Sequence, residues 1–229
     1  MPLAEDSPAD PPVELGPLPG GHHGLSRQEV AESQLERLLA ATAELIAERG
    51  YYGVPITEIA KRASVANRVF YENFKSKEEA FLAAYDAIAD HVTELISATA
   101  GPVADWPGGV AAALRAAIAF FDAEPTIARF CLVAPFTSTP KIAAHGRDRA
   151  AAALPYLAQG RDLHPAGGEL PASTEDSLLG GVVSQLSRSL WAGTEPLGAL
   201  RPDLIEFVLA PYLGPEEARR LAAEADSAG

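Results

Sequence analysis

The sequence TEIAKRASVANRVFYENFKSK, which spans residues 57–77, contains two apolar patterns of helical spacing separated by a short break. Ile59 and Ala63 lie four residues apart before the break, and Phe70 and Phe74 lie four residues apart after it. Residues at this spacing share one face of a helix. We therefore expect two short helices joined by a tight turn, each with its apolar face turned inward.

Polar side chains stand between these apolar positions and suit contact with nucleic acid. Arginine and asparagine can make paired hydrogen bonds to guanine and adenine, and lysine pairs with phosphate. A helix-turn-helix motif places its second helix in the major groove of DNA, which fits this pattern. The polar residues concerned are Lys61, Arg62, Asn67, Arg68, Tyr71, Asn73, Lys75 and Lys77.

The order of the apolar and polar residues resembles a known family. Residues 59–65 read I-A-x-x-A-x-V, and residues 70–78 read F-Y-x-x-F-x-S-K-E, where x is any residue. This order is similar to that of the DNA-binding domain of TetR/AcrR-type transcriptional regulators. The resemblance implies an all-α homodimer that represses or activates transcription, with a small-molecule pocket in a helical bundle behind the DNA-binding domain.

The position of each residue in the second helix predicts its role on DNA. The N-terminal end of such a helix usually contacts the bases. We therefore expect Arg68 to read guanine, Asn67 to read adenine and Val69 to contact a thymine methyl group. The resemblance implies that Tyr71 and Asn73 contact phosphate or sugar.

Other positions of the motif match the family or depart from it. The resemblance implies that Lys77 contacts phosphate at the start of the next helix. Relatives usually place a hydroxyl residue where this chain has Pro55, so we expect Thr57 to take over part of that phosphate contact. Ser64 replaces the usual turn glycine and Ala66 replaces a capping Ser or Thr, and each departure costs about 1 kcal/mol.

The charge of the chain is unevenly distributed. The formal net charge is −13, but residues 27–77 contain eight Lys or Arg against seven Asp or Glu, so the rest of the chain carries −14. An acidic body behind a more basic face discourages non-specific binding to DNA. Glu72 is the exception within the second helix, because a carboxylate repels phosphate and can only accept a hydrogen bond from the amino group of cytosine.

Helix-capping signals flank the motif. Residues 26–29 form a capping box that begins a long amphipathic helix, which Gly50 is placed to end. Residues 76–79 form a second capping box and begin another long helix, through about Ala98. We therefore divide the chain into three parts: a disordered Pro/Gly-rich tail at 1–24, a DNA-binding domain at 25–75, and a helical ligand-binding and dimerisation domain at 76–229.

Several further helices are expected in the third part. One runs from Thr139 to about Ala158, and another runs from Arg201 to Leu213 and is broken near Pro211. A helix from Ser173 to about Ala192 contains Gly180 and Gly181, which indicate the close approach of another helix. The resemblance implies that residues 176–191 and 202–212 pack against a second copy as a four-helix bundle.

Aromatic side chains of the third part are candidates to line an apolar effector pocket. Each of them is more often an ordinary core residue. The candidates are Trp106, Phe120, Phe121, Phe130, Phe136, Tyr156 and Trp191.

The expected function is a DNA-binding regulator, most simply a repressor, that binds a palindromic operator as a homodimer and responds to a small apolar effector. Two alternatives stay open: a DNA-binding factor that is constitutive or controlled by another protein, and an all-α enzyme. No phosphate-binding glycine loop, zinc-ligand spacing or nucleophile elbow is present. Asp86, Asp90 and His91 lie on nearby turns of one helix, but such residues are usually solvated surface, so we expect no metal and no cofactor.

The location of the protein follows from what the sequence lacks. No apolar run approaches the roughly 18 to 20 residues of a membrane span. The start of the chain has neither the basic nor the apolar segment of a signal peptide. Cys131 is the single cysteine, which excludes an intrachain disulfide. We therefore expect a cytoplasmic protein without a membrane partner.

Overall fold

A computed structural model describes residues 26–100, 105–163, 167–193 and 196–227, and all secondary structure in these residues is helical. The expectation of an all-α fold is confirmed. The predicted tail at 1–24 lies outside the described residues. The α-helices are α1 (Arg27–Arg49), α2 (Ile56–Arg62), α3 (Asn67–Asn73), α4 (Lys77–Ala100), α5 (Trp106–Ala123), α6 (Pro125–Leu132), α7 (Pro140–Ala151), α8 (Leu154–Ala158), α9 (Thr174–Ala192), α10 (Arg201–Leu213) and α11 (Pro215–Ser227). The short 3₁₀ turns are η1 (Ala134–Thr137), η2 (Gln159–Asp162), η3 (Gly167–Glu169) and η4 (Leu197–Leu200).

Helix α1 begins and ends where the sequence predicts. The Ser26 side chain accepts a hydrogen bond from the Glu29 amide, and the Glu29 carboxylate accepts one from the Ser26 amide, so the capping box is complete. Gly50 ends the helix with φ of 75°, a conformation that glycine adopts without a side-chain clash. The inner face of α1 buries Leu38 and Leu45 completely or nearly so.

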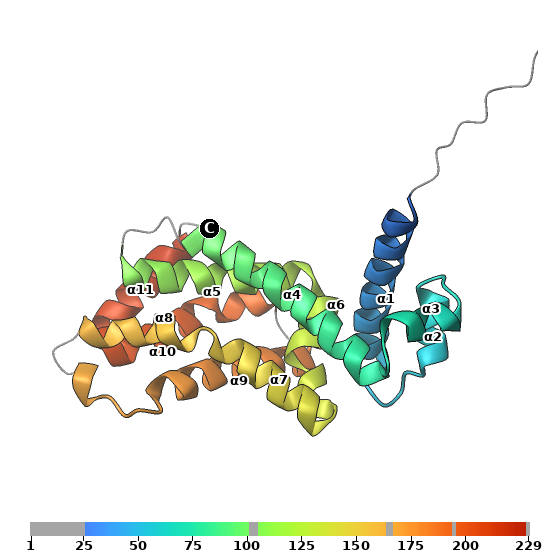
Figure 1. The fold of residues 1–229 in the computed structure, drawn as a ribbon. Coiled ribbons are helices and arrows are strands. Elements are labelled where there is room, and N and C mark those ends of the chain that lie inside the picture. The colour runs from blue at the N-terminus through green and yellow to red at the C-terminus, as the bar shows by residue number, and fades with distance from the viewer. Residues whose placement is uncertain (1–25, 101–104, 164–166, 194–195, 228–229) are drawn as a thin grey trace, which may run out of the picture.

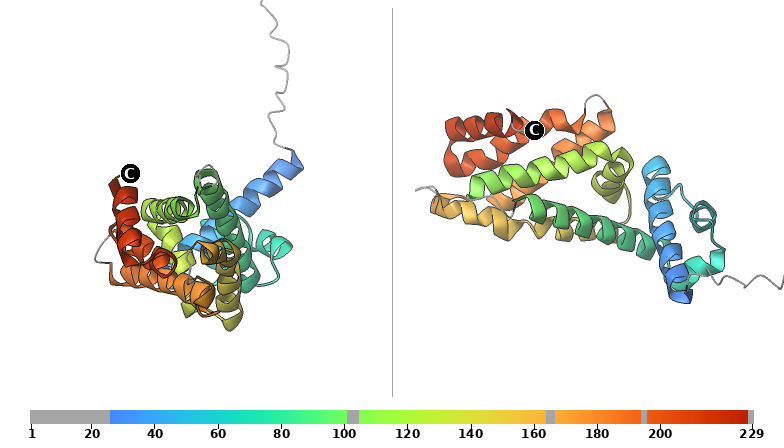
Figure 2. Two further views of the ribbon diagram at one scale, coloured as in Figure 1. Left: turned by 90° about the vertical axis from the view of Figure 1, so that its left-hand side faces the viewer. Right: turned by 90° about the horizontal axis from the view of Figure 1, so that it is seen from above.

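Helices α1, α2 and α3 lie together at one end of the molecule, and α4 runs from that end into the body (Figure 1; Figure 2). The second capping box is shifted by one residue from its simplest form. Ser76 accepts from the Glu79 amide, as expected, but the Glu79 carboxylate accepts from the amide of Lys75. Helix α4 begins at Lys77, after a link of three residues from the end of α3 at Asn73, and runs into the body.

The body is a bundle in which α5 packs against α4, α10 and α11. Helix α6 contacts α1 and α9, and α7 contacts both α4 and α9. The core runs without interruption from the end that holds α1, α2 and α3 into this bundle, because Phe81 of α4 lies 4.5 Å, between ring centroids, from the fully buried Phe130 of α6. No helix in the described ranges has the length and apolar character needed to cross a membrane.

Two helix boundaries differ from the sequence-based expectation. The helix expected to run from Thr139 to about Ala158 ends at Ala151, and α8 begins only at Leu154. Pro155 explains this break, because it has no N–H to donate within a continuous helix but fits the first turn of a new one. The expected break near Pro211 is absent. Helix α10 continues through Pro211 to Leu213, since a proline in the last turn removes only one helical hydrogen bond.

The prediction that adjacent glycines admit a neighbouring helix is confirmed for Gly181. A Cβ atom at this position would lie 2.8 Å from the ring of Phe207 on α10. Gly180 has no atom within 4 Å of such a Cβ position and instead lines a cavity. One glycine therefore brings α9 and α10 together, and the other leaves room beside α9.

Candidate DNA-binding surface and ligand cavity

The turn between α2 and α3 contains Ser64 and Ala66, the two residues that replace the usual turn glycine and capping residue. Ser64 has φ of 55°, the one positive φ of a non-glycine among the described residues. Ala66 is the N-cap of α3 and makes no side-chain capping bond. Pro55 is the N-cap of α2, and it too makes no side-chain capping bond. Thr57 follows it on the exposed surface of α2.

Phenylalanine side chains hold α3 against the rest of the unit. Phe70 is fully buried and Phe74 is nearly so, and their ring centroids lie 5.5 Å apart. This confirms the inward direction of both rings. Burying two large rings on one side of a two-turn helix fixes its rotation, so the opposite side faces outward.

The outward side of α3 carries the predicted base-reading residues. Asn67 and Arg68 are exposed, and Tyr71 is 59% exposed. Arg68 forms an ion pair with Glu72 one turn later, with 2.8 Å between its Nε and the carboxylate. Val69 differs from this group, because it is half-buried and packs against the hydrophobic core.

Asn73 and Lys77 already hold partners within the protein. The amide nitrogen of Asn73 donates to the carbonyl oxygen of Val69 at 2.8 Å. The ammonium of Lys77 donates to the carbonyl oxygens of Tyr51 and Val54 at 2.6 and 2.7 Å. It also lies 4.4 Å from the centroid of the Tyr51 ring, and its partial burial lowers its pKa. Lys77 therefore joins α4 to the segment between α1 and α2.

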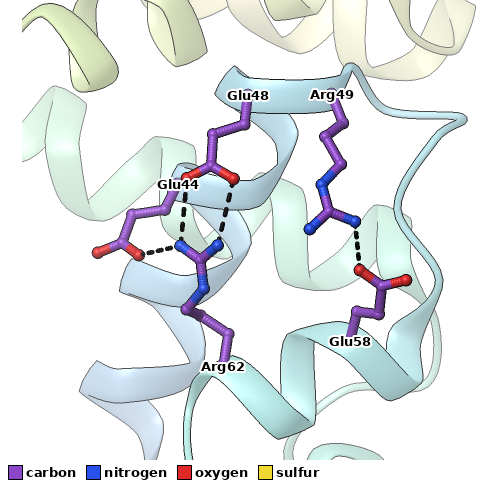
Figure 3. A network of polar contacts seen from close by, with 5 residues as sticks. All are labelled: Glu44, Glu48, Arg49, Glu58 and Arg62. Carbon is purple, nitrogen blue, oxygen red and sulfur yellow. Dashed lines mark hydrogen bonds and ion pairs between the residues drawn. The ribbon is translucent and has the colours of Figure 1, made fainter.

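Arg62 lies where the sequence suggests a phosphate contact, but it binds α1 instead. Its guanidinium reaches Glu44 at 2.9 Å and Glu48 at 3.2 Å (Figure 3). Arg49 forms a further ion pair with Glu58, which again joins α1 to α2 (Figure 3). These groups are partly exposed, so each pair adds little stability alone. Together they orient α2 on α1 and neutralise Arg62.

A cavity of about 760 Å³ opens between α7 and α9. Ala143, Gly146 and Ala150 recur along one face of α7 and line one wall, and their small size leaves the space open. Residues of α9 form the facing wall. The floor comes from Tyr85 of α4 and from α6 and η1, including Cys131. Burial raises the pKa of the Cys131 thiol to about 12 and also raises the pKa of Tyr85.

Two of the aromatic candidates line this cavity, Trp191 and Phe136, and both are largely exposed at its mouth. The remaining five lie elsewhere. Phe130 is fully buried against Phe81, and the indole N–H of Trp106 donates to the carbonyl oxygen of Tyr156 at 2.8 Å. The five candidates outside the cavity lining are Trp106, Phe120, Phe121, Phe130 and Tyr156.

The cavity residues that the sequence reading missed are mostly small or aliphatic. A stripe of alanine and glycine on α7 was the available signal, because small residues on one helix face leave space when the neighbour does not close in. The sequence alone did not say whether another helix would fill that space.

Polar contacts join the opposite face of α7 to α4. Glu78 of α4 accepts a hydrogen bond from the Thr139 hydroxyl at 2.6 Å and pairs with Lys141 at 3.1 Å. The Thr139 hydrogen bond and then the lysine lower the pKa of Glu78. Tyr52, from the segment between α1 and α2, donates to the carbonyl oxygen of Ser138 at 3.4 Å. The start of α7 is therefore tied to the DNA-binding end.

The same contact surface continues along α4 and α7. Asp86 lies 2.7 Å from Nε2 of His145 and 3.4 Å from Nε of Arg149, and Arg149 also pairs with Asp90. The carboxylates of Asp86 and Asp90 thus have partners on α7. His91 instead packs against the ring of Phe120. We refer to the contacts of Glu78, Asp86 and Asp90 with α7 as the α4–α7 seam.

Comparison with known proteins agrees with this architecture. Residues 38–84 match the family described as bacterial regulatory proteins, tetR family. The chain is 26% identical over 126 residues to the HTH-type transcriptional activator FasR of Mycolicibacterium smegmatis, a match that covers 55% of this chain and 58% of FasR. The chain thus spans a little over half the length of that curated relative.

Solved structures share the helical fold. The fatty acid degradation regulator FadR from Bacillus halodurans superposes with a TM-score of 0.68 at 18% identity, covering 76% of this chain and 97% of that one. The transcriptional regulator FadR from Bacillus subtilis, solved in complex with stearoyl-CoA, gives a TM-score of 0.65 at 17% identity. The match covers 78% of this chain and 98% of that one. Residues 38–84 thus match the DNA-binding domain of tetR-family regulatory proteins, and the described chain shares the helical fold of solved regulators.

Proposed function

We propose that the protein is a transcriptional repressor that binds a palindromic operator as a homodimer and releases it when a small apolar effector enters the cavity. The observation that carries the proposal is the orientation of α3. Its phenylalanines are buried while Asn67, Arg68 and Tyr71 face outward from one end of the molecule. Side chains that can read base edges are thus presented on a short exposed helix, as major-groove recognition requires.

The proposed DNA contacts keep the roles that the helix positions indicate. Arg68, Asn67 and Val69 meet bases, and the remaining residues meet phosphate or sugar. In this proposal residues 25–75 act as the DNA-binding domain and 76–229 as the ligand-binding and dimerisation domain. The residues proposed to contact DNA are Thr57, Asn67, Arg68, Val69, Tyr71, Asn73 and Lys77.

The proposed dimer pairs α9 and α10 with the same helices of a second copy. Its support is the presence of large apolar side chains that a single chain leaves exposed on these helices, Trp191 at 65% and Phe207 at 38%. A two-fold axis would place two α3 helices on one side of the duplex, which predicts an operator with two inverted half-sites.

The cavity supports the proposed effector. Its walls are mostly aliphatic or aromatic, and its volume of about 760 Å³ falls within the range of ligand sites in proteins. The Bacillus subtilis neighbour was solved with stearoyl-CoA and the Bacillus halodurans neighbour regulates fatty acid degradation. We therefore propose an effector that carries an acyl or similar long apolar chain.

The α4–α7 seam supplies the proposed route from effector to DNA. Helix α7 has one face on the cavity and the other on α4, and α4 begins four residues after α3 ends. A ligand that displaces α7 would shift α4 as a rigid element and change the separation of the two recognition helices.

The experiment that tests the proposal is selection of bound sequences from a random duplex DNA pool with the purified protein at moderate salt. The expected result is an inverted repeat. The recovered duplex is then titrated with the protein, with and without fatty acids, to measure the sign of the response. FasR is named an activator, so effector-strengthened operator binding would contradict the repressor part, and recovery of no sequence above background would contradict specific DNA binding.

A further inference from the structure

We propose that the cavity takes an amphipathic anion, with its apolar chain inside and its carboxylate or phosphate head held at the rim by Arg147 and Arg188. The inference rests on the proposed function, in which the cavity is the effector site. It adds the chemical class of the head group and the residues that select it.

The interior of the cavity suits a chain and offers little to a polar head. Leu132, Val133 and Pro135 lie on the floor side, and Leu179 and Val183 lie on the α9 wall. The hydroxyl of Ser187, which also lines the cavity, is within hydrogen-bond distance of the carbonyl oxygen of Leu132 at 2.6 Å. Transfer of a charged head into such surroundings is unfavourable, so the head stays at the rim.

Two arginines line the cavity from different helices, Arg147 on α7 and Arg188 on α9. Both are exposed, and neither forms an ion pair or side-chain hydrogen bond with any residue that the structure describes. By contrast, Arg149 of α7 is paired with Asp86 and Asp90. Guanidinium groups bind carboxylate and phosphate through paired hydrogen bonds, so two free ones at an apolar opening form a receptor for an anion.

The charged residues that line the cavity also favour an anionic head group. The chain outside residues 27–77 carries −14, yet two of the three ionised residues that line the cavity are arginines. The third, Asp176, is unpaired with either arginine and lies twelve residues before Arg188 on α9, which is about 18 Å along the helix. Ser184, one turn before Arg188, adds an exposed hydroxyl next to the proposed head. The head is thus attracted to the Arg188 end and repelled from the Asp176 end.

The test measures binding of four ligands that share one chain and differ in the head: dodecanoate, dodecyl phosphate, dodecan-1-ol and dodecyltrimethylammonium. Each is titrated into the full-length protein below its micelle concentration, and binding is followed by calorimetry. We expect the two anions to bind about tenfold or more tighter than the alcohol and the cation, because charge-assisted hydrogen bonds are lost with the latter. The ratio of the Kd values of dodecanoate and dodecyl phosphate shows whether the site prefers a carboxylate or a phosphate head.

Substitutions of the two arginines test whether they bind the head group of the ligand. Arg147→Gln and Arg188→Gln should each weaken dodecanoate binding about tenfold while leaving dodecan-1-ol unchanged. Arg188→Lys should retain part of the preference for anions. Arg129→Gln is the matched control, since Arg129 is exposed on α6 and is not a lining residue. Thermal melting without ligand verifies that each variant is folded.

The outcomes separate this inference from the proposed function. Equal binding of alcohol and carboxylate, with both releasing operator DNA, would overturn the head-group inference and leave the effector cavity intact. Tight binding of the anions that depends on the arginines but does not alter operator affinity would support the inference and contradict the proposed response. Binding of none of the four ligands would contradict the inference.

Discussion

Arg68 and Glu72 form an ion pair on the exposed face of α3, with Nε of the arginine 2.8 Å from the carboxylate. The arginine side chain is 86% exposed, so the pair lies fully on the surface that the helix would present to DNA. The arginine that we propose to read a base is therefore paired with a carboxylate of its own helix. Binding of guanine must exchange this partner for the base, and the carboxylate then lies near phosphates.

Glu72→Gln should strengthen operator binding. The change removes a negative charge from the DNA-facing helix and frees Arg68, so we expect about a two- to fivefold lower operator Kd. Fluorescence anisotropy with the selected duplex measures this. Glu224→Gln is a matched control, because Glu224 also pairs with an arginine four residues away, but on α11. An unchanged or higher Kd for Glu72→Gln would show that the carboxylate supports the arginine in the complex.

Lys77→Met should destabilise the protein, beyond any effect on DNA. The ammonium holds the carbonyl oxygens of Tyr51 and Val54, and their loss of a partner should cost about 1 to 3 kcal/mol in the free energy of unfolding. Urea unfolding followed by circular dichroism measures it. Lys75→Met removes an exposed lysine two residues earlier and serves as control. If both variants unfold at the same urea concentration as the wild type, Lys77 acts on phosphate alone.

Asp86→Asn should weaken communication between the cavity and DNA. Asp86 contacts both His145 and Arg149 across the α4–α7 seam. The ratio of operator Kd values with and without saturating dodecanoate gives the coupling free energy between the cavity and DNA. We expect the substitution to lower this coupling free energy by about 0.5 to 2 kcal/mol. Asp148→Asn, on α7 but outside the seam, should leave the ratio unchanged. Full ligand response in Asp86→Asn would exclude this part of the seam as the route.

Cys131 should react slowly with thiol reagents in the native protein. Burial raises its pKa to about 12, so at pH 8 the reactive thiolate is scarcer than in the unfolded chain, where the pKa is lower. Absorbance with Ellman's reagent should show native labelling more than about tenfold slower than labelling in urea. Added dodecanoate should slow the native rate further, because Cys131 lines the cavity. Ligand-independent labelling would place the ligand elsewhere.

The DNA-binding end could be predicted in detail because its signals are local. Both capping boxes, the terminating Gly50 and the four-residue spacing of Phe70 and Phe74 act within one or two helical turns. The positive φ of Ser64 agrees with the resemblance, in which relatives usually have a turn glycine at this position. Residues that interact within a turn leave a pattern in the sequence.

The body could be predicted only in outline, because its contacts join distant residues. Asp86 meets His145 59 residues later, and Glu78 meets Thr139 61 residues later. Nothing in the local pattern distinguishes Phe130, which fills the core, from Trp191, which borders the cavity. Which apolar side chain lines a cavity is decided by how the helices pack, and that depends on the whole fold.

The effect of Arg68→Ala on operator binding tests whether the exposed face of α3 reads DNA. We expect the substitution to cost about 1 to 3 kcal/mol in binding free energy and to relax base preference at one position of each half-site, because a paired contact to guanine is lost. Competition with duplexes that vary each base pair in turn measures both effects. An operator Kd and base preference identical to those of the wild type would contradict the assignment of α3 as the recognition helix.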